Sequence, residues 1–149
     1  MILLAHMLFG AAIGSIIRSW PLAVILAYLG HYFLDLFPHT EYHIENIKNK
    51  QWSKSLPEFL NVTLDFCAGL LLILLFSKNQ LILYVCALVA ILPDLFTILS
   101  YFFSNKILEI HNNMHRKKIH FLENKKISIS WRITSQITVL IISIVMFKL

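Results

Sequence analysis

The sequence predicts an all-α protein, a polytopic membrane bundle of about five transmembrane helices that forms one domain over residues 1–149. Of the 149 residues, 58% are hydrophobic and only 14% are charged, which lies outside the usual composition of a soluble domain. The apolar residues fall into five stretches of about 17 to 23 residues, and a helix needs about 17 to 25 residues to cross a bilayer. In lipid such stretches are expected to be helices, because a helix satisfies its own backbone polar groups.

The five predicted spans, in chain order, are residues 1–17, 21–37, 57–76, 81–103 and 131–147. The first has no basic segment before its apolar run and no A-x-A cleavage pattern before Arg18, so we expect a retained helix. Gly10 and Gly14 form a G-x-x-x-G pattern, which predicts close helix packing and makes a homodimer through this face conceivable. Residues 106–122 can form a short amphipathic helix at the membrane surface.

The basic residues predict the orientation of the bundle. With five spans, the N-terminus and the two long loops share a side that carries ten of the 13 lysines and arginines. The positive-inside rule then places the N-terminus and both loops in the cytoplasm of a bacterial inner membrane. Since topology explains the net charge of +5, we predict no nucleic-acid partner.

Metal-capable side chains gather at one predicted depth, near the cytoplasmic side. Ionisable groups in the membrane are costly and mark a functional site by default. His31 and Asp35 share a helix face and Pro38 ends that helix, while His111 and His115 have the same spacing. The candidate ligands are His6, His31, Asp35, His39, Asp65, Asp94, His111 and His115. Imidazole and carboxylate together predict one or two divalent cations, with zinc favoured and manganese or magnesium as alternatives.

Several of these residues stand in recognisable motifs. The segments Leu92-Pro93-Asp94 and His115-Arg116-x-x-x-His120, with His6 and His31-x-x-x-Asp35, resemble those of the bacterial membrane-bound metal-dependent hydrolases. Phe96 and Thr97 stand where that family usually has a further aspartate and histidine. The resemblance implies a metal-dependent hydrolase embedded in the membrane.

The residue inventory is compatible with hydrolysis. A bound cation would lower the pKa of a water molecule and polarise a phosphoryl or acyl oxygen. Asp65 and Glu41 are the candidate general bases, and the sequence does not choose between them. Arg116, Lys117 and Lys118 could bind a phosphate head group, or instead anchor the loop to anionic lipids. The expected substrate is a lipid or lipid-linked phosphoester or ester at the cytoplasmic interface.

Two other functions fit the same residues. The protein could bind or transport a metal ion without catalysing a reaction, although the two halves of the chain show no internal repeat of the kind common in transporters. It could also be a structural bundle in which polar side chains join the helices. In that case, replacing Asp35 by alanine would lower stability without changing the metal content.

Overall fold

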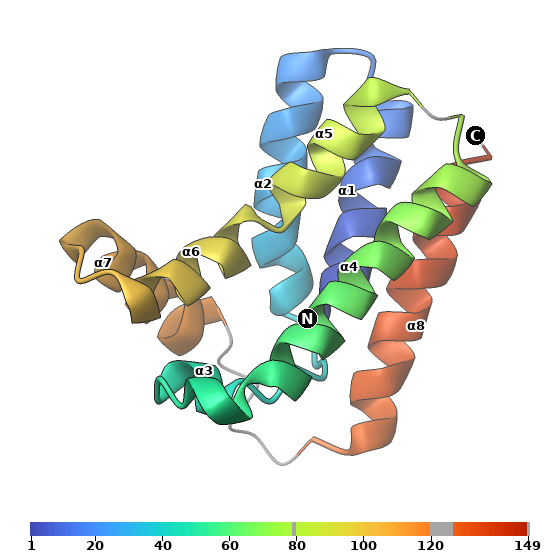
Figure 1. Ribbon diagram of the computed structural model, residues 1–149. Helices are drawn as coiled ribbons and strands as arrows, with labels where there is room; N and C mark the ends of the chain where they lie inside the picture. The colour runs from blue at the N-terminus through green and yellow to red at the C-terminus, as the bar shows by residue number, and fades with distance from the viewer. Residues whose placement is uncertain (79, 120–126, 149) are drawn as a thin grey trace.

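The computed structural model describes residues 1–78, 80–119 and 127–148, and these residues form only helices and their connections (Figure 1). The predicted all-α class is therefore confirmed. The helices are α1 (Leu3–Ile16), α2 (Trp20–Asp35), α3 (Glu45–Lys48), α4 (Leu56–Phe76), α5 (Leu81–Ala90), α6 (Leu92–Phe102), α7 (Lys106–Met114) and α8 (Ile129–Met146). A 3₁₀ turn (η1, Trp52–Lys54) precedes α4, and a π-helical turn (η2, His115–Ile119) follows α7.

Helix α1 is the centre of the bundle. It contacts α2 and α5 on one side and α4 and α8 on the other (Figure 1). Its residues Met7 and Leu8 are completely buried and join Ile73 of α4 and Leu83 of α5 in the main apolar core. The small residues of α1 allow four helices to approach it closely, so this helix positions the ends of its neighbours.

The G-x-x-x-G face of α1 packs against α5 within the chain. A Cβ atom added at Gly10 would lie 2.6 Å from both the Ala90 Cβ and the Cys86 carbonyl oxygen. At Gly14 an added Cβ would lie 3.1 Å from the Ile82 carbonyl oxygen. Because α5 already covers these glycines, the structure gives no support to a homodimer through them.

Gly10→Ala should lower the free energy of unfolding by about 1–3 kcal/mol, because the added methyl group meets backbone that has no room to move. Gly69→Ala is the matched control, since the new methyl group there would meet the flexible side chain of Met7, at 2.8 Å from its sulfur atom. Thermal unfolding of the two purified variants in the same detergent gives the comparison. An equal loss in both variants would contradict this account of the α1–α5 contact.

Two helices, α4 with 21 residues and α8 with 18, are long and apolar enough to cross a membrane. Helices α5 and α6 make a third span if they count as one, although they are bent by 45° at their junction. Helices α1 and α2 have only 14 and 16 residues. The structure therefore contains two or three candidate spans, and the predicted number of about five is not confirmed.

The outer faces of the long helices are apolar. Large side chains on α4 and α8 project outward, and Leu64 and Trp131 expose 66% and 67% of their surface. Helix α7, the described part of the predicted amphipathic segment, also exposes the apolar side chains of Ile107 and Ile110. Exposed apolar surface of this extent is compatible with a membrane-associated protein.

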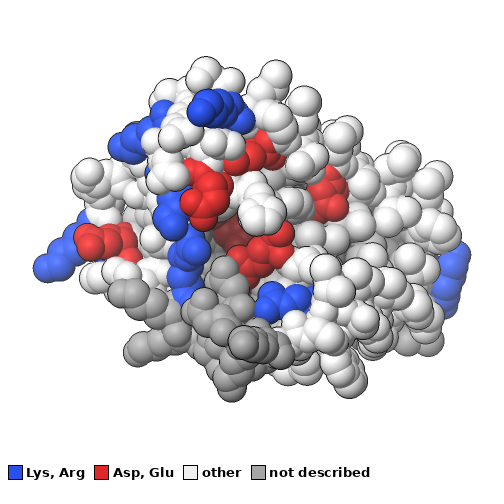
Figure 2. All heavy atoms as spheres, turned by 90° about the horizontal axis from the view of Figure 1, so that it is seen from below, with Lys and Arg blue, Asp and Glu red and all other residues white. Residues whose placement is uncertain are grey.

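The last turns of α2 and α6 and the helices α3 and α7 lie toward one end of the bundle, which we call the polar end (Figure 1). Figure 2 looks onto this end and shows acidic side chains near its centre, flanked by basic ones. Glu58, at the start of α4, accepts hydrogen bonds from the backbone N–H groups of Asn46 (3.0 Å) and Ile47 (2.9 Å). This carboxylate thus attaches α3 to α4 and shapes the polar end.

Candidate metal centre

The last turn of α2 places two of the predicted ligands on one face. His31 and Asp35 are four residues apart in the helix, and both side chains are buried. The Nε2 atom of His31 lies 3.1 Å from the Oδ2 atom of Asp35. The helical spacing thus brings an imidazole and a carboxylate together at the polar end of the bundle.

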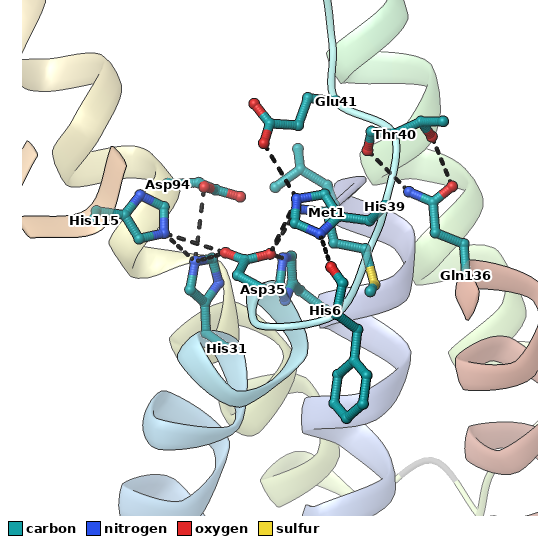
Figure 3. Close-up of polar contacts among 12 residues, drawn as sticks. Met1, His6, His31, Asp35, His39, Thr40, Glu41, Asp94, His115 and Gln136 are labelled. Atoms are coloured by element: carbon teal, nitrogen blue, oxygen red, sulfur yellow. Dashed lines mark hydrogen bonds and ion pairs between the residues drawn. The ribbon is translucent and has the colours of Figure 1, made fainter. Parts of the chain in front are cut away.

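Two further ligands come from distant parts of the chain. Asp94 stands in the first turn of α6 and His115 directly after α7. The Nε2 atom of His115 lies 3.0 Å from His31 Nε2 and 3.2 Å from Asp35 Oδ2, and Asp94 Oδ1 lies 3.7 Å from His31 Nε2. One ligand atom from each of these four residues lies within 4.8 Å of all the others (Figure 3). We call His31, Asp35, Asp94 and His115 the four-residue centre.

These separations suit ligands of a common ion. Zinc binds imidazole nitrogen and carboxylate oxygen at about 2.0–2.2 Å, and in tetrahedral geometry such ligand atoms stand about 3.3–3.6 Å apart. Four of the six separations between ligand atoms in the four-residue centre, from 3.0 to 3.7 Å, bracket that range, and all six are within 4.8 Å.

Hydrogen bonding determines which nitrogen of His31 faces the centre. The Nδ1 atom lies 2.7 Å from the Ala90 carbonyl oxygen, so Nδ1–H is the donor and Nε2 of the neutral ring carries a lone pair. This lone pair points at the Asp35 carboxylate, which also only accepts. Two facing acceptors repel each other unless a cation lies between them or the ring is protonated, and metal-binding histidines are typically oriented in this way.

The junction of α5 and α6 explains how Ala90 and Asp94 reach the centre. Ala90 is the last residue of α5, where carbonyl groups lack partners within the helix. Pro93 occupies the first turn of α6, because proline is favoured where no N–H donor is needed. The bend therefore presents a free carbonyl to His31 and, one residue after the proline, the Asp94 carboxylate.

Thr97 was not among the predicted ligands, and it positions His115. It lies three residues after Asp94 on α6 and is buried, and its hydroxyl group lies 3.2 Å from His115 Nδ1. The helical spacing to Asp94 is the sequence signal that could have identified it. A contact at Nδ1 leaves the Nε2 atom of His115 directed toward Asp35.

Two other predicted histidines border the centre on the opposite side of Asp35. His6 of α1 is fully buried, stacks on His31 with ring centroids 4.0 Å apart, and brings Nε2 to 3.2 Å from Asp35 Oδ1. His39 brings its Nε2 to 3.7 Å from the same oxygen and 3.2 Å from Glu41 Oε1. The amino group of Met1 also lies 2.6 Å from Asp35 Oδ1.

His111 lies beside the four-residue centre and is not part of it. Its ring stacks on His115 at a centroid distance of 5.6 Å, and its Nε2 atom lies 3.0 Å from the Tyr32 hydroxyl group. Burial, followed by the nearby imidazoles of His115 and His31, lowers the pKa of His111 and favours its neutral form. His111 therefore supports the orientation of His115.

Asp65, predicted both as a ligand and as a base, also lies outside the four-residue centre. Its carboxylate accepts hydrogen bonds from the Leu4 backbone N–H at 2.8 Å and from the Tyr42 hydroxyl group. Burial and this hydrogen bond raise the pKa of Tyr42. The contacts of Asp65 are those of a positioning residue, and its roles as ligand and as base stay predictions.

A pocket of about 90 Å³ adjoins the centre. Asp94 and His115 line it on one side, and Glu41 and Arg116 also contribute to its wall. The Nη1 atom of Arg116 donates a hydrogen bond to the Tyr101 hydroxyl group at 2.7 Å. Much of the remaining lining is apolar: Leu3, Ile44, Val62 and Ile98. The pocket therefore combines charged and apolar side chains directly beside the candidate metal centre.

Three residues singled out in the sequence are not placed by the structure. The side chains of Lys117 and Lys118, predicted to bind phosphate, and residue His120 lie outside the described part of the chain.

No protein family, no curated protein and no solved structure matches this chain. The functional conclusion therefore depends on the geometry of the four-residue centre and its pocket.

Proposed function

We propose that this protein is a membrane-embedded, metal-dependent hydrolase that acts on a lipid or lipid-linked phosphoester or ester. The observation that carries the proposal is the convergence of His31, Asp35, Asp94 and His115 from three separate elements beside a pocket that Arg116 lines. The resemblance of the L-P-D and H-R-x-x-x-H segments to membrane-bound metal-dependent hydrolases agrees with it.

The ligand chemistry favours zinc. Two imidazole nitrogens and two carboxylates match the donor types that zinc accepts, and manganese can use the same set, whereas magnesium prefers oxygen ligands. Two carboxylates also balance the charge of a divalent ion. This balance matters because the site is buried, as the 1% exposure of Asp35 indicates. We expect one ion at the four-residue centre.

Hydrolysis needs an activated water molecule, a proton acceptor and a group that binds the substrate, and the ion and two side chains of the pocket could provide them. A divalent ion would lower the pKa of a bound water molecule and polarise the oxygen of the bond that is cleaved. Glu41 lines the pocket and is placed to accept a proton there, whereas Asp65 is not among the lining residues. Arg116 can donate charge-assisted hydrogen bonds to phosphoryl oxygens.

The location of the site suggests how a lipid would reach it. The pocket lies at the polar end of the bundle, and α4 and α8 present apolar outer faces. A lipid whose polar group lies at headgroup level could therefore reach the pocket from the side. The bias of lysine and arginine toward this end supports the proposal that it faces the cytoplasm at a bacterial inner membrane.

The test is an activity screen on purified protein loaded with zinc, manganese or magnesium. Among phospholipids and polyprenyl phosphates, we expect one class to release its head group or phosphate, and Asp94→Asn to lose this activity. His43→Ala is the control, because His43 is exposed and lies outside the four-residue centre. If no substrate is cleaved by protein that holds its metal, the hydrolase proposal is wrong.

Arg116→Gln should raise the KM for a phosphorylated substrate by about tenfold to a hundredfold, because hydrogen bonds to a charged group contribute about 1.5–3 kcal/mol. The rate at saturation should change less. Arg18→Gln serves as the matched control, since Arg18 is exposed near the start of α2, outside the pocket lining. Equal KM values for both variants would remove Arg116 from substrate binding.

One observation favours the second candidate, a metal-ion carrier or sensor. Helices α5 and α6 are bent by 45° beside Asp94, and broken helices near ion ligands are typical of transporters. Zinc uptake by proteoliposomes that contain the protein, compared with empty vesicles, separates transport from hydrolysis. Uptake that Asp94→Asn abolishes, without hydrolysis of any lipid, would favour the carrier.

A further inference from the structure

We propose that Asp35 bridges two divalent cations: one at the four-residue centre and a second bound to its other oxygen by His6 and His39. This inference rests on the proposed metal centre and extends it to a two-metal site that selects phosphoesters. The two carboxylate oxygens of Asp35 face different groups of ligands, as Figure 3 shows.

The distances divide the ligands between the two oxygens. Oδ2 of Asp35 lies 3.1 Å from His31 Nε2 and 3.2 Å from His115 Nε2. Oδ1 lies 3.2 Å from His6 Nε2 and 3.7 Å from His39 Nε2. Each oxygen of one carboxylate thus has two imidazole nitrogens beside it, which is the arrangement expected of a carboxylate between two ions.

His6 is the strongest indication of a second ligand site. The side chain is fully buried in the central helix α1, and among the described residues neither ring nitrogen makes a hydrogen bond of good geometry, although Nε2 lies 3.2 Å from Asp35 Oδ1. Burying a polar group without a partner is costly, and most buried polar groups in native proteins are satisfied. A cation bound to both His6 Nε2 and Asp35 Oδ1 would satisfy this imidazole nitrogen.

His39 has the orientation of a ligand. Its Nδ1 atom lies 2.7 Å from the Phe37 carbonyl oxygen, so Nδ1–H donates and the Nε2 lone pair faces Asp35 and Glu41. Both of these carboxylates only accept, so a cation in front of Nε2, either a metal ion or a proton on the ring, is what would join the three groups.

Helix α8 holds the segment that carries His39. Arg132 donates a hydrogen bond to the His39 carbonyl oxygen at 3.1 Å. Gln136 accepts from the Thr40 hydroxyl group at 2.7 Å and donates to the Thr40 carbonyl oxygen at 2.9 Å. The histidine is therefore positioned by tertiary contacts although it lies outside any helix.

The Oδ1 side of Asp35 accommodates positive charge in this structure. The amino group of Met1 forms an ion pair with this oxygen at 2.6 Å, and both groups are buried. A divalent ion bound to Oδ1 would take over the charge compensation that the ammonium group provides here. Three protein ligands, His6, His39 and Asp35, would leave room in the coordination shell for water or substrate.

The pocket connects the two proposed ions to one substrate. Glu41, which contacts His39, lines it, as do Asp94 and His115 of the four-residue centre. Two ions about 3.5–4 Å apart can stabilise both the attacking and the leaving oxygen of a phosphoryl displacement. Together with Arg116, this favours a phosphoester over a carboxylic ester as the substrate.

The first test is the metal content of purified, zinc-loaded protein after removal of free metal. We expect about two zinc ions per chain in the wild type and about one in His6→Ala and in His39→Ala, since each loses the second site. The His43→Ala control should keep both ions. Far-ultraviolet circular dichroism identifies variants that fail to fold, and His6→Gln then replaces His6→Ala.

The second test uses the wild type alone. Loaded with manganese, it should give the electron paramagnetic resonance signal of two exchange-coupled ions. A signal from isolated manganese with about one ion per chain would overturn the bridging role of Asp35 and leave the four-residue centre intact. Protein that binds no divalent ion would overturn the proposed function together with this inference.

Discussion

Asp35→Asn should leave the purified protein without bound metal and lower its hydrolytic rate by about a thousandfold. The Asp35 carboxylate is the central group of the site and lies within 4 Å of five other groups: the imidazoles of His6, His31, His39 and His115 and the amino group of Met1. An amide keeps the shape of the side chain and removes its charge. Loss of the ion removes several kcal/mol of transition-state stabilisation, and each 1.4 kcal/mol corresponds to a factor of about ten in rate.

The control for this variant is Asp65→Asn. Asp65 is also a carboxylate in the bundle and lies outside the four-residue centre, where it accepts from Leu4 and Tyr42. We expect this variant to keep its metal, as measured by elemental analysis. If Asp35→Asn also keeps its full metal content and only loses stability, Asp35 is a structural group and the metal centre is wrong.

Removal of metal by a chelator should lower the melting temperature of the wild type by about 5–10 °C. An ion that binds only the folded state at about a hundred times its Kd stabilises that state by about 2.7 kcal/mol, which in a chain of this size corresponds to a shift of this order. The physical cause is the set of acceptors that face one another in the absence of a cation, above all His31 Nε2 and the Asp35 carboxylate. Differential scanning fluorimetry in detergent, with and without zinc, measures the shift.

The same measurement on Asp35→Asn is the internal control. This variant lacks the carboxylate that holds the ion, so zinc should leave its melting temperature unchanged. The zinc-loaded wild type, with one or more ions per chain, is compared with the same protein after a chelator has removed the zinc. Equal melting temperatures for these two samples would show that the ion does not bind preferentially to the folded state. A metal site built from buried ligands would then be wrong.

Features that depend on neighbouring residues were predictable from the sequence. The all-α class follows from apolar stretches long enough for a helix, and helices cover each of the five stretches. The pairing of His31 with Asp35 follows from a spacing of four residues in one helix. Pro93 is likewise a local signal for the break beside Asp94, because proline lacks the N–H group that a continuous helix needs.

Features that depend on contacts between distant residues were not predictable. The contact of Thr97 with His115, the contact of Tyr42 with Asp65 and the pocket wall became visible only in the folded chain. Gly10 predicted close packing without a partner, and the structure identifies α5 as that partner. The lengths of α1 and α2 and the bend in the fourth stretch likewise reduced the candidate spans to two or three.

By itself the sequence determined that this chain is helical and apolar and which side chains could bind metal, because composition and helical spacing are local properties. Only the tertiary structure decided which of these side chains meet. It brought His115 to His31 across 84 positions of the chain and left Asp65 bound to Leu4 and Tyr42. The reason is that convergence depends on how α1 packs against its four neighbours, and no local pattern records that packing.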